Sequence, residues 1–260
     1  MMHFRKALPD EGTLELTEFE LKLYERQIQL PGFGTTAQRQ LRNASAMISR
    51  VGGLGGTVAM LLARAGIGKL VLAHDGVVEH ENLNRMHLAF REDIGKSRIK
   101  TFRDTLRRIN PGIEIVAEGD NVSSANVRAL VAQSDLVIDG APLFTERYAM
   151  NVEAVRRRKP LVMAAMFGLE SYITTIVPGR TPCLSCLYPD PPEYWDLRMF
   201  PVIAPSSSQV ASIAAMEAVK LITGYGEPLL NQLLYSDLSN NTFRRFNIER
   251  HADCPVCGSI

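Results

Sequence analysis

Two cysteine pairs constrain the fold of this chain more than any other feature. Its four cysteines occur as Cys183-x-x-Cys186 and Cys254-x-x-Cys257. Two residues between thiols let both sulfurs of a pair reach one metal ion, and this spacing is typical of tetrahedral zinc sites. The sequence therefore predicts one structural Zn²⁺ that ties the C-terminal end of the chain to its middle. Such a site is closed, so it stabilises folding and leaves no open position for catalysis.

The alternatives for these cysteines are two disulfides or four unrelated thiols. The N-terminal residues contain no apolar core of signal-peptide length, and no stretch approaches the ~20 apolar residues that span a bilayer. We therefore expect a cytoplasmic protein without a membrane partner, in which thiols stay reduced and available to a metal. The net charge of +1 gives no indication of a nucleic-acid partner.

Predicted helices and strands alternate along the chain, which is typical of an α/β fold with helices on both faces of a mostly parallel sheet. We expect helices at 17–30, 35–43, 93–109, 124–132, 145–158 and 207–223. We expect strands at 69–73, 113–117, 135–139, 160–166 and 172–177. An antiparallel hairpin at 232–238 and 241–248 would close the sheet, and a long crossing loop at 188–205 carries Trp195. Residues 1–16 are predicted to be a flexible tail, and 17–260 a single domain.

The segment 46–66 predicts a Rossmann-like βαβ unit: a strand, a tight turn with Gly52, Gly53 and Gly55, and a helix that ends at Gly66. Glycines at such a turn let the backbone approach phosphates and let the helix pack on the strand. The alternative is a tight turn that binds nothing. Lys96 and Arg98 lie at the start of a predicted helix, where the helix dipole disfavours cations unless they face an anion.

Several short motifs follow one another along the chain. They are Tyr24-x-Arg26-Gln27, Gly52-Gly53-Leu54-Gly55-Gly56, Asn82-Leu83-Asn84-Arg85, Asp93-Ile94-Gly95-Lys96, Asn110-Pro111 and the two cysteine pairs. Their order and spacing resemble those of the HesA/MoeB/ThiF proteins, the prokaryotic relatives of ubiquitin-activating E1 enzymes. The resemblance covers about residues 17–258 and is closest to the HesA branch.

This resemblance implies a homodimer that binds ATP with Mg²⁺ at the glycine turn. It implies adenylation of the C-terminal carboxylate of a small ubiquitin-like sulfur-carrier protein, with release of pyrophosphate, after which a sulfurtransferase could supply sulfur. By the same resemblance, Arg26 would reach the partner subunit's site, Arg85 would contact the phosphates, and Asn82 would lie in the ATP site.

The chain departs from the family pattern at four positions of the expected nucleotide site. Arg50 replaces the first turn glycine, and Arg98 replaces a phosphate-binding lysine. His74, followed by Asp75, replaces the aspartate that holds the ribose, and Pro142 replaces the aspartate that handles Mg²⁺. Magnesium would then need Asp139 or Asp75. The crossing loop has no cysteine, so we expect no enzyme thioester.

Three hypotheses remain open at this point. The first is an E1-like adenylyltransferase with a rebuilt ATP site. The second is a weakened or inactive paralogue that acts as a binding scaffold or as the non-catalytic half of a heterodimer, and nucleotide turnover separates it from the first. The third is a dinucleotide-dependent oxidoreductase, which lacks the expected acidic residue for the ribose and would require NAD binding without ATP affinity.

Overall fold

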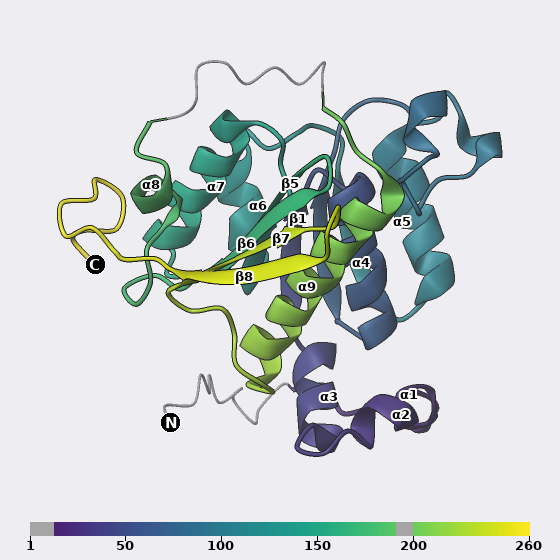
Figure 1. Cartoon of the computed structure of the whole chain (residues 1–260). Coiled ribbons are helices and arrows are strands. Elements are labelled where there is room, and N and C mark those ends of the chain that lie inside the picture. The colour runs from purple at the N-terminus through teal and green to yellow at the C-terminus, as the bar shows by residue number, and fades with distance from the viewer. Residues whose placement is uncertain (1–12, 191–199) are drawn as a thin grey trace.

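An eight-stranded sheet forms the centre of the protein, with the order β3-β2-β1-β4-β5-β6-β7-β8 (Figure 1). The computed structural model describes residues 13–190 and 200–260. Strands β1 to β5 run parallel, and β6, β7 and β8 continue the sheet antiparallel, which confirms the predicted fold class. The strands are β1 (Ser45–Ser49), β2 (Lys69–Ala73), β3 (Glu114–Glu118), β4 (Leu136–Asp139), β5 (Leu161–Phe167), β6 (Glu170–Ile176), β7 (Gln232–Asp237) and β8 (Thr242–Asn247).

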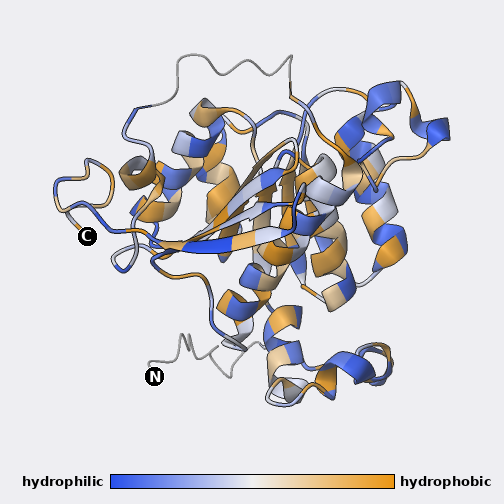
Figure 2. Ribbon diagram, in the orientation of Figure 1, coloured by the Kyte–Doolittle hydropathy of each residue, from blue (hydrophilic) through white to orange (hydrophobic). Residues whose placement is uncertain are grey.

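Helices cover both faces of the sheet and create two apolar cores (Figures 1 and 2). Neighbouring β1 residues point to opposite sides: Ile48 joins the core under α4, α5 and α9, and Met47 joins the core under α6 and α7. Strands buried on both faces are expected in a parallel sheet. The helices are α1 (Glu18–Leu23), α2 (Glu25–Ile28), α3 (Gly34–Arg42), α4 (Gly53–Ala65), α5 (Arg98–Ile109), α6 (Val127–Ala132), α7 (Phe144–Arg156), α8 (Leu184–Leu187) and α9 (Ala204–Thr223).

Two of the expected helices differ in the structure. The helix predicted at 17–30 starts with a capping box between Thr17 and Glu20, but it breaks at the buried Tyr24 into α1 and α2. The helix predicted at 93–109 begins only at Arg98, because Gly95 takes a left-handed φ of 84° that no α-helix accommodates. Residues Arg91–Asp93 form a short 3₁₀ turn instead.

The strand order identifies where a ligand would bind. The chain turns from β1 toward β2 on one side and reaches β4 on the other, so the carboxyl ends of β1 and β4 flank a topological switch point. Open α/β sheets bind ligands in the crevice at that point. Part of the predicted crossing loop, residues 191–199 with Trp195, lies outside the described residues. Among the described helices, none combines the length and apolar character needed to cross a membrane.

Candidate functional site

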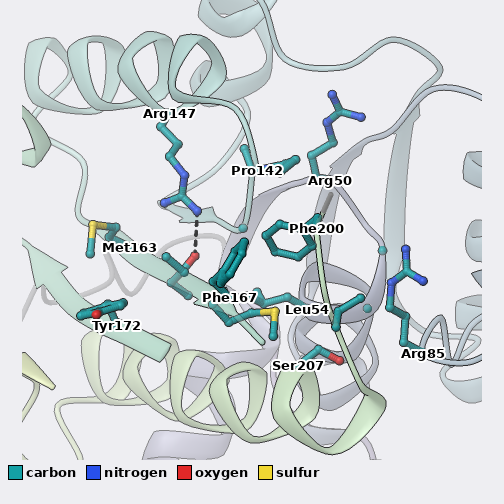
Figure 3. Close-up of a pocket in the computed structure, with 18 of the residues that line it drawn as sticks. Arg50, Leu54, Arg85, Pro142, Arg147, Met163, Phe167, Tyr172, Phe200 and Ser207 are labelled. Atoms are coloured by element: carbon teal, nitrogen blue, oxygen red, sulfur yellow. Dashed lines mark hydrogen bonds between the residues drawn. The ribbon is translucent and has the colours of Figure 1, made fainter. Parts of the chain in front are cut away.

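A cavity of about 480 Å³ opens at this switch point (Figure 3). Gly52 and Gly53 of the turn after β1 line it, together with residues from the ends of β2, β4 and β5. Gly55 lies behind them, where an added Cβ would be 2.6 Å from the carbonyl oxygen of Arg50, so only glycine fits. The N-terminus of α4 is therefore held against the cavity, and free backbone N–H groups at a helix N-terminus favour a bound anion.

Arg50 has a left-handed backbone conformation, which glycine adopts more readily than other residues. Its φ is +50°, a left-handed value that costs a non-glycine residue of order 1–3 kcal/mol. Its guanidinium forms a fork with Glu146, with Nη2 to Oε1 at 2.6 Å and Nε to Oε2 at 2.9 Å, and Nη1 lies 3.6 Å from Asp75. Arg50 also lines the cavity. The strained backbone is thus compensated by a charge-assisted pair that fixes the side chain.

Asn82, Arg85 and Arg98, which the sequence analysis assigned to the nucleotide site, all line the cavity. The buried amide oxygen of Asn82 accepts from Nε of Arg98 at 3.1 Å, and Nη2 of Arg98 pairs with Glu79 at 2.6 Å. Arg85 donates to the carbonyl of Glu81 at 2.7 Å and has no ion-pair partner within the described parts of the chain. Burial and the charge of Arg98 lower the pKa of Arg85, but a guanidinium stays charged.

His74, which the sequence analysis placed where a ribose would bind, directly follows β2. The side chain is buried, lines the cavity, and leaves Nδ1 without a hydrogen-bond partner among the described residues. Burial, together with the positive charges of Arg98 and Arg50, lowers its pKa from 6.5 to about 4. At neutral pH this ring is uncharged, so it offers a single neutral hydrogen bond where the family pattern has a carboxylate.

Three other predicted residues, Lys96, Asp75 and Asp139, lie outside the cavity lining. Lys96 is exposed and pairs with Asp93 at 2.9 Å, and Asp75 is half-exposed beside Arg50. Asp139 is buried, where burial raises its pKa, and it accepts from Arg147 at 3.1 Å and from the Ala141 N–H at 3.0 Å. Since neither aspartate lines the cavity and both already face guanidinium groups, the expected Mg²⁺ ligands do not fit this site.

Arg26 lies far from the cavity of its own chain. It is exposed on α2, and its neighbour Gln27 donates to the carbonyl of Ala65 at the C-terminal end of α4. The cavity lies at the N-terminal end of this 13-residue helix, a distance of roughly 20 Å along the helix. Figure 1 shows α1 and α2 at the opposite end of the sheet from the glycine turn.

Sequence reasoning missed the apolar half of the cavity. Strands β5 and β6 and the segment before α9 contribute Met163, Met166, Phe167, Tyr172 and Phe200 (Figure 3). Arg147 reaches from α7 to β5, where it donates to the carbonyl of Ala164 at 3.2 Å. The apolar residues belong to ordinary strand patterns, so no signal in the sequence distinguished them from core residues.

The four cysteines come together as predicted. Their sulfurs all lie within 4.8 Å of one another, with Cys183 to Cys254 at 3.7 Å and Cys186 to Cys257 at 3.5 Å. A tetrahedral zinc with Zn–S bonds of about 2.3 Å has sulfur–sulfur edges of about 3.8 Å, so the cluster fits this ion. Burial raises the Cys254 pKa, but backbone N–H donors from Cys257 and Val256 outweigh that effect and lower it to about 7. This thiol is therefore readily ionised for metal binding.

Comparisons with known proteins agree with this geometry. The ThiF family model matches residues 24–256. The protein HesA, heterocyst, of Trichormus variabilis is 47% identical over 246 residues, which cover 95% of this chain and 92% of that protein. The sulfur carrier protein adenylyltransferase of Thermus thermophilus is 33% identical over 257 residues, covering 93% and 92%. A crystal structure of Escherichia coli MccB with AMPCPP and SeMet MccA has a TM-score of 0.82 at 27% identity, covering 91% of this chain and 74% of that one. Since the family match extends over nearly the whole sequence, the chain belongs to the ThiF family.

Proposed function

We propose that this chain is an E1-like adenylyltransferase that activates the C-terminal carboxylate of a small ubiquitin-like sulfur-carrier protein with ATP and releases pyrophosphate. The observation that carries the proposal is the N-terminus of α4 at the cavity wall, beside the guanidinium of Arg85, which has no ion-pair partner among the described residues. The likeness to the sulfur carrier protein adenylyltransferase of Thermus thermophilus supports the substrate class.

The residues present suit this reaction. A carboxylate oxygen attacks the α-phosphorus, the bond to the pyrophosphate oxygen breaks, and an acyl-adenylate forms. Such a reaction mainly needs positioning of the reactants and neutralisation of charge. Arg85, Arg98 and the N–H groups of α4 would stabilise the phosphates, and the apolar half of the cavity would hold the tail of the carrier protein.

The four cysteines support a reaction without an enzyme thioester. All four lie in the buried cluster, so no cysteine remains to accept the acyl group. A Zn²⁺ held by four thiolates would close that site and stabilise the fold. Available thiolates also accord with the cytoplasm, where disulfides are rare. The acyl-adenylate would then pass directly to a sulfur donor such as a sulfurtransferase.

A second subunit would complete the site. Arg26 has no side-chain hydrogen bond or ion pair among the described residues of its own chain, and exposed apolar side chains occur on α1 and just after α2. Their exposed fractions are 72% for Phe19, 40% for Leu21, 55% for Leu23 and 46% for Leu30. Contact with a second copy would bury this surface, and we propose that Arg26 enters the partner subunit's cavity. An active paralogue could take the same place in a heterodimer.

The second candidate function is a weakened or inactive paralogue that acts as a binding scaffold. The observation that favours it is the neutral His74 at the ribose position, together with Pro142 at the position of the Mg²⁺ aspartate. A scaffold of this kind would still bind a partner through α1 and α2, but it would not turn over nucleotide.

Two measurements test the proposal. The first is calorimetric binding of ATP to the zinc-loaded full chain, with AMP and NAD as comparisons. The second is ATP–pyrophosphate exchange with a panel of ubiquitin-like carrier proteins, each matched with a variant that lacks its C-terminal glycine. Exchange that requires this glycine supports the adenylyltransferase. ATP binding without exchange for any carrier favours the scaffold, and NAD binding without ATP affinity would revive the oxidoreductase.

A further inference from the structure

Guanidinium groups dominate the polar part of the cavity wall. Arg50, Arg85, Arg98 and Arg147 line it, and the described lining contains no aspartate or glutamate. Four carboxylates that do not line the cavity contact these guanidiniums. Glu146 and Asp75 contact Arg50, Glu79 contacts Arg98, and Asp139 contacts Arg147.

This arrangement is the reverse of a magnesium site. Mg²⁺ in a nucleotide site is held by one or two carboxylates as well as by phosphate oxygens and waters. Pro142, at the end of β4, has no side-chain oxygen to offer. Recruiting Asp139 would break its pair with Arg147 and leave a buried charge alone, since both side chains are at least nine-tenths buried.

Arg50 is held where its guanidinium can neutralise part of the phosphate charge that Mg²⁺ would otherwise neutralise. The N–H of Gly52 donates to the carbonyl of Arg50 at 2.6 Å, so Arg50 belongs to the same tight turn that presents the N-terminus of α4. Glu146 occupies Nε and one edge of Nη2, while Nη1 lies 3.6 Å from the half-exposed Asp75, which is beyond hydrogen-bond distance. The N–H groups of Nη1 therefore make no hydrogen bond to the described residues and can donate to an anion. Figure 3 shows Arg50 and Arg85 on the right of the view and Arg147 on the left.

We propose that this cavity binds the phosphate chain of a nucleoside triphosphate through Arg50, Arg85 and Arg98, and that the protein supplies no ligand to a divalent cation. The inference rests on the proposed function, since it concerns the same cavity. His74 adds no charge, because its buried ring is neutral, so the arginines alone neutralise the phosphates. ATP and MgATP should therefore bind with comparable affinity.

The test is isothermal titration of the zinc-loaded full chain with ATP, first in buffer freed of divalent cations by chelating resin and then with excess MgCl₂. Zinc content is measured before and after each titration. We expect the two dissociation constants to agree within about threefold, since no protein ligand is lost with the metal. Binding that requires Mg²⁺ would overturn this inference and leave the proposed function intact. Absence of binding under both conditions would overturn both.

Variants at Arg50 and Pro142 test whether these residues determine metal-free ATP binding. Arg50→Gly should weaken binding of metal-free ATP by about tenfold or more, since a charge-assisted hydrogen bond is lost. Arg50→Gly combined with Glu146→Gln avoids a buried unpaired carboxylate, and melting temperature confirms folding. Pro142→Asp adds a carboxylate at the cavity, so Mg²⁺ should now tighten ATP binding.

Arg107→Ala is the matched control, because Arg107 is exposed on α5 and does not line the cavity. It should change neither titration. Unaltered binding of metal-free ATP in both folded Arg50 variants would overturn the assignment of Arg50.

Discussion

Arg50 and Glu146, 96 residues apart in the sequence, form a two-bonded ion pair that joins the glycine turn to the first turn of α7. Only 5% of the glutamate side chain and 19% of the arginine side chain are exposed. The pair therefore stabilises a backbone conformation that arginine rarely adopts, and it does so at the wall of the cavity.

Replacing Glu146 should reveal this coupling in the stability of the fold. Glu146→Ala leaves the Arg50 guanidinium partly buried without its carboxylate, and breaking such a pair costs about 3 kcal/mol. We expect this loss in the free energy of unfolding measured with urea. Glu114→Ala is the control, since Glu114 pairs with Lys69 at the surface and should cost less than about 1 kcal/mol. Equal losses for the two variants would show that the Arg50–Glu146 pair does not hold the turn.

Arg85→Ala should abolish nucleotide binding and leave the fold intact. Arg85 lines the cavity, and its guanidinium donates only to neutral acceptors, the Glu81 carbonyl and the Asn84 side chain. Its removal therefore breaks no ion pair among the described residues. Loss of a charged contact to phosphate corresponds to at least about tenfold in affinity. Calorimetry measures binding, and melting temperature measures folding. Arg64→Ala, on the exposed face of α4, should leave both unchanged, and an unchanged ATP affinity in Arg85→Ala would place the nucleotide site elsewhere.

The zinc cluster should contribute to the stability of the whole domain. Cys183→Ser or Cys257→Ser removes one of four thiolate ligands and should lower the free energy of unfolding by several kcal/mol, because metal binding is coupled to folding. Elemental analysis should show loss of zinc from the same variants. A variant that keeps both its metal and its melting temperature would refute the structural role of the cluster.

His74 makes stability depend on pH in a defined direction. Its pKa is about 4 in the fold and 6.5 ordinarily, so the unfolded chain binds the proton first as the pH falls. The stabilisation that depends on a neutral His74 is fully present above about pH 6.5, and it is lost as the pH falls toward 4. Between pH 7 and pH 5 the loss is about 2 kcal/mol. The His74→Gln variant lacks this group but keeps the zinc cluster, so the wild type should lose about 2 kcal/mol more than the variant in urea unfolding. Parallel losses would mean that His74 is not buried as a neutral ring.

The local elements of the site could be predicted from the sequence, and its long-range contacts could not. The glycine spacing and Gly66, which ends α4 with a left-handed φ of 91°, indicate the β1–α4 turn directly. The cysteine spacing predicts the cluster in the same way. The sequence shows that Arg50 replaces a glycine, but its orientation depends on Glu146, which only the folded chain brings into contact.

The apolar half of the cavity shows the same limit. Met163, Met166 and Tyr172 belong to strands whose pattern is equally compatible with an ordinary core. Their exposure to the cavity follows from the place of β5 and β6 beside the switch point, which is a property of the sheet order. Asp139 gives a further example: the sequence shows that it ends β4, but its ion pair with Arg147 of α7 is a contact that only the folded chain forms.

The position of Arg26 leads to a test of subunit exchange. In a dimer whose Arg26 enters the partner subunit's cavity, Arg26→Ala and Arg85→Ala should each eliminate pyrophosphate exchange when pure. In a mixed dimer, one cavity receives Arg85 from one protomer and Arg26 from the other, and this cavity is intact. The second cavity lacks both arginines. Random mixing produces half mixed dimers with one intact cavity of two, so about a quarter of wild-type exchange should return. Refolding or prolonged co-incubation supplies the mixed dimers, and size-exclusion chromatography verifies the assembly. If Arg26 acted within its own chain, each protomer would carry a broken cavity and mixing would restore nothing, which would remove the dimer from the proposed mechanism.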